Sequence, residues 1–317
     1  MNLSKNTLAV AVGLLLSLAA CRQAEAPPTS TGATYLEEIQ SFQQERDRRF
    51  RSPFSQLAMV HRAYLRDAAR TAIGNGPEAD VKLTGEDVAP VHAVVEGSSD
   101  TPTLRAAQGP VWSLDDPPQP LTELRLEDRA SFRIGRFNFL YVLHPSWGRT
   151  FEVYDTRLPA LLEFTGMEYF PIDPAYRVTG TVVPHSDPES IHLIDSHGNQ
   201  RPYWIYGELH FELHGTPCRL EVYSTTTEAR EIEERGFMLM FTDETSGKES
   251  YPLARYLDVE GSASGTITVD FNQAYNPPCN YSAAFTCPFP RKQNRLPVAV
   301  RAGQKWYRGS SSESASH

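Results

Sequence analysis

Short runs rich in β-branched and aromatic residues, separated by Gly and Pro, recur along the chain after its first fifty residues. The clearest of them are 91–95, 131–134, 137–143, 176–183, 207–213, 237–241 and 266–271. Runs of this length and composition are typical of β-strands, and no segment between them has a strong helical period. Many short strands joined by turns indicate β-sandwiches or barrels. We therefore predict an all-β protein.

One helix is predicted, and it precedes these runs. Thr34 followed by Glu37 has the pattern of a capping box, which starts a helix, and Pro53 ends it. The helix therefore spans residues 34–53. Its apolar side chains share one stripe: Leu36, Ile39, Phe42 and Phe50. The charged residues 45–49 lie on the other face, which we expect to be solvated.

The N-terminus carries the marks of an export signal. A positive Lys5 precedes the apolar segment 8–18, which is too short to span a bilayer. The run 18–21, Leu-Ala-Ala-Cys, resembles a bacterial lipoprotein lipobox. The resemblance implies removal of residues 1–20, a diacylglyceryl thioether on Cys21 and acylation of the new amine with a fatty acid such as palmitate. The alternative is an ordinary signal peptide or uncleaved anchor with a Cys here by chance.

The expected location is the cell envelope, with the lipid chains as the only membrane contact. Each buried CH₂ contributes about 0.8 kcal/mol, so several chains suffice as an anchor. Arg22 rather than Asp follows Cys21, which favours the outer membrane, facing the periplasm, if the source is Gram-negative. The chain has a formal net charge of −9, and loss of the segment with Lys5 makes it −10. An acidic chain argues against nucleic acid as a partner.

The chain divides into six segments by composition and pattern. They are a signal peptide (1–20), a lipidated Cys with a flexible stalk (21–33), the helix (34–53), a first β-sandwich (54–147), a second antiparallel β domain, sandwich or barrel-like (148–308), and a Ser-rich disordered tail (309–317).

Three cysteines remain after Cys21, and two of them lie close in sequence. In an oxidising compartment Cys279 and Cys287 are the natural disulfide pair. Closing so short a loop stabilises a fold by about 2–3 kcal/mol in the chain-entropy model, so its main effect would be on the loop. A two-thiolate metal site and a redox pair are the alternatives, although no further Cys or His nearby completes four ligands. Cys218 is expected to be a buried apolar side chain.

Two groups of residues within 54–147 resemble a forkhead-associated domain. They are 73–75, 80–83 and 88–93, followed by 126–128, 132–135 and 137–142. The resemblance implies a β-sandwich. That family reads phosphothreonine with an Arg after the Gly and a Ser shortly before the His, where this chain has Asn75 and Ala89 and retains His92. Neither replacement can neutralise a phosphate, so we expect no phosphothreonine binding.

Polar blocks of the C-terminal third, with a few earlier positions, carry a second resemblance. The blocks are 241–251, 269–279, 287–290, 294–297 and 302–305, with 164–166, 169–171 and the helix around Arg46. Together they resemble the bacterial family known as domain of unknown function 1684, over nearly the whole mature chain. Gln304 departs from the Ala-Gly-Glu-Lys ending of that family. The resemblance implies membership and no particular activity.

The same blocks contain the candidate site. The candidate ligand-binding or catalytic residues are Asp243, Glu249, Tyr251, Arg255, Asp270, Asn272, Tyr275, Asn276 and Asn294. Strand alternation places Asp270 and Asn272 on one face, Arg255 offers a fork for a carboxylate or phosphate, and Asp243 with Glu249 offers an acid and a base. Alternatively, Asn and Asp beside Pro satisfy their own loops, and Asp270 with Arg255 forms a buried ion pair.

These residues predict binding of a small polar ligand or a peptide in the C-terminal β domain. A hydrolase that uses Asp243, Glu249 or Asp270 as acid and base is the alternative from another class. A scaffold that docks a partner protein through a sheet edge is the third. We expect no metal and no cofactor.

Overall fold

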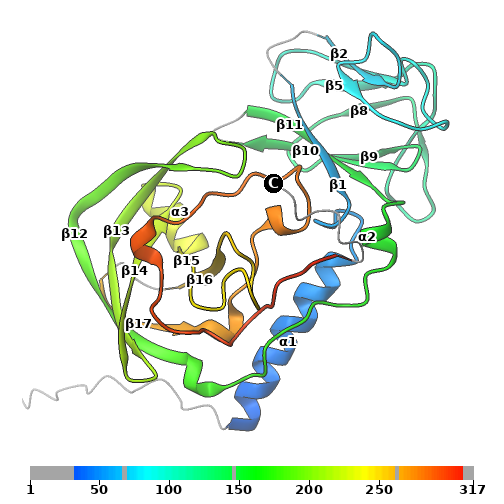
Figure 1. Ribbon diagram of the computed structural model, residues 1–317. Coiled ribbons are helices and arrows are strands. Elements are labelled where there is room, and N and C mark those ends of the chain that lie inside the picture. Colours follow the sequence, from blue (N-terminus) through cyan, green and yellow to red (C-terminus); the bar gives the residue numbers. More distant parts are fainter. Residues whose placement is uncertain (1–31, 66–69, 145–147, 261–263, 310–317) are drawn as a thin grey trace, which may run out of the picture.

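The computed structural model describes residues 32–65, 70–144, 148–260 and 264–309. The predicted signal peptide, Cys21, nearly all of the stalk and most of the tail lie outside these residues. The chain forms two lobes, with the long helix α1 (Gly32–Phe50) beside the second of them (Figure 1). The all-β prediction is confirmed, and α1 ends at Phe50, three residues before Pro53.

The first lobe is a sandwich of two sheets. The six-stranded sheet has the order β1 (Met59–Tyr64), β11 (Gly148–Asp155), β10 (Phe137–His144), β9 (Ser131–Ile134), β6 (Val111–Trp112), β7 (Pro120–Leu121). The five-stranded sheet has the order β3 (Val81–Lys82), β2 (Arg70–Gly74), β4 (Ala93–Glu96), β5 (Thr103–Ala106), β8 (Glu123–Arg125). Apolar side chains from both sheets form one core. At its centre Phe132 stacks on Phe139 at 4.7 Å, and Phe151 meets both rings edge-on.

Strand β11 corrects the predicted boundary between the lobes. The sequence assigned residues 148–155 to the second domain, whereas β11 pairs with β10 and with β1 in the first. Phe151 and Val153 of this strand are fully buried in the sandwich core. The first lobe therefore extends to Asp155, because β11 forms a hairpin with its sequence neighbour β10 and also pairs with the distant strand β1.

The second lobe is a strongly curved antiparallel sheet that forms half a barrel (Figure 1). Its order is β16 (Arg255–Val259), β15 (Phe237–Phe241), β14 (Thr216–Ser224), β13 (Gln200–Leu213), β12 (Arg177–Ile194), β17 (Gly265–Asp270). The short helices α2 (Pro159–Leu162) and α3 (Ala229–Arg235) and four 3₁₀ turns at Pro174–Tyr176, Phe271–Gln273, Pro278–Asn280 and Lys292–Asn294 complete the lobe.

Residues 298–308, here called the strap, run across the open side of the half-barrel (Figure 1). Leu296, Val300 and Ala302 are fully buried against the apolar side chains of the sheet. The path of the strap requires a glycine at Gly303. Its φ is +74°, and a Cβ there would lie 2.5 Å from the carbonyl oxygen of Ala274. The half-barrel is therefore closed by its own chain.

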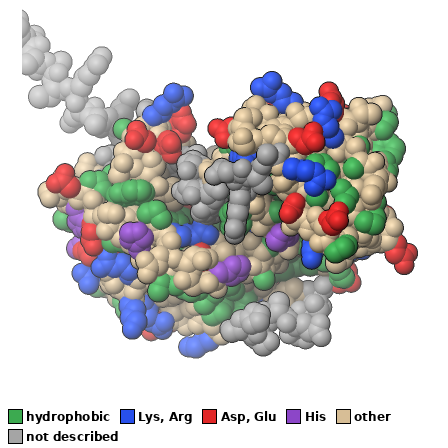
Figure 2. Space-filling view, turned by 90° about the horizontal axis from the view of Figure 1, so that it is seen from above, with side chains coloured by type: hydrophobic (Ala, Val, Ile, Leu, Met, Phe, Trp, Pro, Cys, Tyr) green, Lys and Arg blue, Asp and Glu red, His purple; other side chains and the backbone are tan. Residues whose placement is uncertain are grey.

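On the face shown in Figure 2, acidic and basic side chains are interspersed rather than gathered by sign. The net negative charge of the chain is therefore not concentrated on that face. Within the described ranges, no helix combines the length and apolar character needed to cross a membrane.

Candidate functional site

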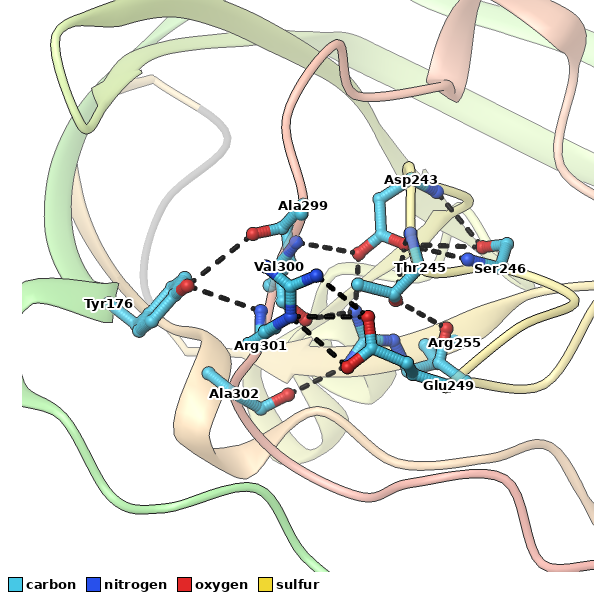
Figure 3. A network of polar contacts seen from close by, with 11 residues as sticks. Tyr176, Asp243, Thr245, Ser246, Glu249, Arg255, Ala299, Val300, Arg301 and Ala302 are labelled. Atoms are coloured by element: carbon cyan, nitrogen blue, oxygen red, sulfur yellow. Dashed lines mark hydrogen bonds and ion pairs between the residues drawn. The ribbon is translucent and has the colours of Figure 1, made fainter.

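A buried ion pair between Asp243 and Arg255 holds the strap (Figure 3). Arg255 Nη2 donates to Asp243 Oδ2 at 2.5 Å, and the two side chains are only 1% and 0% exposed. Arg255 also donates to the carbonyl oxygens of Ala302, at 2.7 Å, and Val300, at 2.8 Å. Burial lowers the pKa of the Arg255 guanidinium, and the Asp243 carboxylate opposes that shift. The predicted buried pair exists, but the partner of Arg255 is Asp243 rather than Asp270.

Asp243 is saturated by donors from its own chain. Its Oδ2 accepts the N–H of Val300 at 3.1 Å, and its Oδ1 accepts the N–H and the hydroxyl of Thr245 at 2.8 and 2.6 Å. The Ser246 N–H adds a further bond at 3.1 Å. A buried carboxylate with this many donors is stabilised in place and has no open side for a substrate. Asp243 therefore acts structurally in this arrangement.

Glu249 lies on the outer side of the strap and is separate from Asp243 in environment. It forms an exposed pair with Arg301, with Nη2 to Oε1 at 2.9 Å. The hydrogen bonds from Arg301 lower the pKa of the Glu249 carboxyl. Because one carboxylate is buried and the other is exposed, the expected acid–base pair of Asp243 and Glu249 does not face a common cleft.

Asp270 and Asn272 share a face, and they use it to hold α1. Tyr35 of α1 donates its hydroxyl to Asp270 Oδ2 at 2.8 Å and accepts from Asn272 Nδ2 at 2.9 Å. Asn272 Nδ2 also donates to the carbonyl oxygen of Asp173. Burial and the neighbouring carboxylate raise the pKa of Tyr35 well above its usual value. These two candidates therefore attach the N-terminal helix to the half-barrel.

Asn276 and Asn294 bond to backbone groups, Asn276 in the strap and Asn294 in strands β15 and β14. Asn276 Nδ2 donates to the carbonyl oxygen of Lys305 at 2.7 Å. Asn294 Nδ2 donates to the carbonyl oxygen of Met240 at 2.9 Å, and its Oδ1 accepts the N–H of Glu221. Such partners are what buried irregular backbone requires.

Tyr275 and Tyr251 also bond within the chain. Tyr275 donates its hydroxyl to the carboxylate of Asp258 at 3.0 Å, and the guanidinium of Arg46 lies 4.2 Å from its ring centre. Tyr251 donates to Cys279 Sγ at 3.7 Å. Burial raises the pKa of both tyrosines.

Cys279 and Cys287 are free thiols in the structure, and the disulfide expected from their spacing stays a prediction. They are nevertheless in contact, since the N–H of Cys279 donates to Cys287 Sγ at 3.1 Å. Cys218 is buried as expected, and burial raises the pKa of its thiol.

A second polar group was missed by the sequence reasoning, and Tyr281 is at its centre. Tyr281 donates to Gln304 Oε1 at 2.9 Å, and Gln304 Oε1 also accepts the N–H of Asn276. Arg46 and Asn276 lie close enough to Tyr281 for their hydrogen bonds to lower its pKa, against the larger effect of burial. Four buried atoms here have no partner in the protein: Arg46 Nε, Asn276 Oδ1, Asn280 Oδ1 and Gln304 Nε2. Gln304, the departure from the resembled family, is one of them.

A cavity of about 350 Å³ opens on the outer side of the strap. It is lined by residues 163–166, Glu168 and Glu249, and by residues 305–309. Arg308 stacks on the Trp306 ring at 4.1 Å, and Lys305 Nζ lies 3.7 Å from a Glu168 oxygen. Among the candidates from the sequence, only Glu249 reaches this cavity. The signal that could have found it is that two of the resembling blocks contribute to its lining, 164–166 in full and 302–305 through Lys305.

The described part of the chain contains no group of three or more His, Cys, Asp or Glu side chains placed to hold a metal ion.

Fold and site define a two-lobed, mostly β protein whose buried polar centre holds its own C-terminal strap. Residues 162–305 match the family described as "Protein of unknown function (DUF1684)". This match supports, over residues 162–305, the family that the C-terminal blocks of the sequence predict.

Two solved structures are similar to parts of the chain. An uncharacterized protein from gene locus rrnAC0354 of Haloarcula marismortui, solved by NMR, is 36% identical over 47% of this chain and 80% of its own, with a TM-score of 0.40. Mycobacterium tuberculosis EmbR in complex with a low-affinity phosphopeptide is 19% identical over 31% of this chain and 24% of its own, with a TM-score of 0.22. Overlaps with these TM-scores support no conclusion about function. A search of curated proteins found no match.

Proposed function

We propose that the chain is a lipid-anchored envelope protein that binds a small polar ligand in the cavity on the outer side of the strap. The observation that carries the proposal is the meeting of aromatic rings and charges of both signs in one hollow of about 350 Å³. Ligand sites are typically concave, with apolar walls and a few convergent polar groups. Phe164, Trp306 and Tyr307 supply the rings, and Lys305 with Glu249 supplies opposite charges.

A ring sugar with a charged substituent suits this lining. Its apolar face can stack on an aromatic ring, and its hydroxyls can bond to the charged side chains. The strap that carries Lys305 and Trp306 is held from behind by Arg255 and Asp243. The buried pair would thus keep one wall of the cavity in place without touching the ligand.

The hydrolase alternative receives no support from the geometry. Asp243 is 0% exposed and saturated by its own chain, and Asp270 bonds to Tyr35 and Asn272. The scaffold alternative rests on one observation: β1 is an edge strand with Val60 40% and Tyr64 51% exposed. An open strand edge can pair with an extended peptide.

A thermal-shift screen with glucosamine, glucuronate and N-acetylglucosamine tests the proposal. A ligand at a hundred times its Kd should stabilise the protein by about 2.7 kcal/mol. Trp306→Ala should abolish the shift, while Trp112→Phe, a matched change in the sandwich, should preserve it. A shift that persists in Trp306→Ala would place the ligand elsewhere. A screen without any shift would favour the scaffold, to be followed by crosslinking at β1.

We also infer that the first lobe is a forkhead-associated-like sandwich without phosphothreonine binding. Asn75 Nδ2 donates to the carbonyl oxygen of Val88 at 2.5 Å. The buried His92 accepts the N–H of Ala89 at Nδ1, and its Nε2 lies 3.0 Å from the carbonyl oxygen of Pro110. Both side chains are thus engaged with backbone. Titration with a phosphothreonine peptide and its unphosphorylated control should give no difference, and tight, phosphate-dependent binding would contradict this inference.

A further inference from the structure

Cys279 and Cys287 form an asymmetric pair of neighbouring thiols. Cys287 is 4% exposed, whereas Cys279 is partly exposed. The Cys279 N–H donates to Cys287 Sγ at 3.1 Å, and Tyr251 donates its hydroxyl to Cys279 Sγ. The two side chains are thus already adjacent, and Cys279 is the more exposed residue of the two.

The loop between the two cysteines, residues 280–286, joins the lobes. Ser282 Oγ donates to the carbonyl oxygen of Met59 in β1 at 2.6 Å. Phe285 packs against the cluster of Met59 and Tyr154 in the sandwich. The Tyr281 ring meets the Phe50 ring of α1 edge-on at 4.6 Å. One short loop therefore contacts the first lobe and α1, and its base is the cysteine pair in the second lobe.

We propose that Cys279 and Cys287 form a reversible disulfide whose formation closes the base of this loop and stiffens the contact between the lobes. The thiols are suited to exchange chemistry. A hydrogen bond from the Cys287 thiol lowers the pKa of Cys279, and the same bond with burial raises the pKa of Cys287. Cys279 is therefore the thiol that reacts first, since the thiolate is the nucleophile.

The oxidant is a disulfide of the envelope thiol–disulfide pool. The Cys279 thiolate attacks one sulfur of that disulfide, forms a mixed disulfide and releases one thiolate. Cys287 then loses its proton and attacks Cys279 Sγ, which breaks the mixed bond and releases the second thiolate. Two protein thiols are oxidised, one external disulfide is reduced to two thiols, and the two protons pass to the products.

Thiol counting tests the proposal in the full chain with Cys21→Ser. Four cysteines minus Cys21 leave three, so alkylation after reduction should label three thiols. After equilibration with oxidised glutathione it should label only one, Cys218, and reduction should restore three. Three labelled thiols under all glutathione ratios would overturn the proposal, as would a disulfide that includes Cys218.

Single variants test the order of attack. Cys287→Ser should retain one glutathione on Cys279, because the resolving thiol is gone. Cys279→Ser should retain none on the buried Cys287. Cys218→Ser, the matched control, should form the disulfide normally. Equal glutathione capture by Cys279 and Cys287 would refute the assignment of Cys279 as the first thiol.

Amide hydrogen exchange tests the effect on the lobes. Oxidation should slow exchange in residues 280–286 and in β1 by roughly ten- to a hundredfold, because the closed loop has fewer open states. The helix α3 (Ala229–Arg235), which belongs to neither the loop nor β1, should be unchanged. A disulfide that forms without slowing exchange in β1 would overturn the coupling between the lobes.

Discussion

Replacing Asp243 by Asn distinguishes a structural from a functional polar centre. Asn retains one acceptor oxygen in a side chain of nearly the same shape, but it removes the charge that faces Arg255. Arg255 is 1% exposed and donates to Asp243 at 2.5 Å. Removing one member of a buried pair leaves the other charge uncompensated, which costs about 3–5 kcal/mol. The same substitution replaces an acceptor of the Val300 N–H with an amide.

The loss should be visible in urea unfolding followed by circular dichroism. A domain is stable by about 5–15 kcal/mol in total, so the midpoint should fall substantially. The double variant Asp243→Asn/Arg255→Met should be more stable than Asp243→Asn alone, because it removes the unpaired charge. Glu249→Gln, which breaks the exposed pair with Arg301, is the matched control and should leave the midpoint nearly unchanged.

An unchanged urea midpoint in Asp243→Asn would refute this reasoning. So would a double variant that is less stable than the single one, since the excess cost would then not come from an unpaired charge. In either case Asp243 and Arg255 would be free to serve a ligand, and the polar centre would again be a candidate binding site.

Three further substitutions have expected outcomes. Gln304→Glu should stabilise the protein by about 1–2 kcal/mol at neutral pH, since it places a carboxylate beside the Tyr281 hydroxyl, which also contacts the cationic Arg46. The new carboxyl should have a lowered pKa in the folded state, so the gain should disappear as pH falls below about 4.3 in urea titrations. Asn272→Ala should cost about 1–3 kcal/mol by freeing α1, read as a lower melting temperature with faster amide exchange in the helix. Cys21→Ser should release the protein from membranes, and unchanged pelleting after a carbonate wash would contradict the lipobox.

Local pattern sufficed for the fold class and for the existence of α1, because alternation, turns and the stripe at Ile39 report on neighbouring residues. It did not suffice for the charged face of α1, since Arg46 lies over the Tyr275 ring and Asp47 accepts the N–H of Met167. It failed where distant segments decide. The composition of the strand at 148–155 does not indicate which lobe it belongs to. Its pairing with β1 and β10 places it in the sandwich. The closing of the half-barrel by the strap was equally invisible, since its contacts with Arg255 span more than forty residues.

The sequence suggested a ligand-binding or catalytic site because these residues are polar. In the structure, the same polar side chains pair with buried backbone groups. The strap and residues 271–294 are largely irregular backbone packed inside the half-barrel, where sheet partners are absent for many N–H and C=O groups. Buried backbone groups must be paired, and side chains supply the partners: Arg255 for Val300 and Ala302, Asn276 for Lys305.

A half-barrel that contains buried irregular backbone therefore requires many Asn, Asp and Arg side chains as hydrogen-bond partners, whether or not the protein binds a ligand. It follows that ligand chemistry should be sought where polar groups remain accessible after the backbone is satisfied. On the described surface that condition holds at the cavity beside Glu249, Lys305 and Trp306. If Trp306→Ala abolishes a ligand shift while Asp243→Asn mainly lowers stability, the two roles are separated, with Asp243 and Arg255 holding the strap and its outer face meeting the ligand.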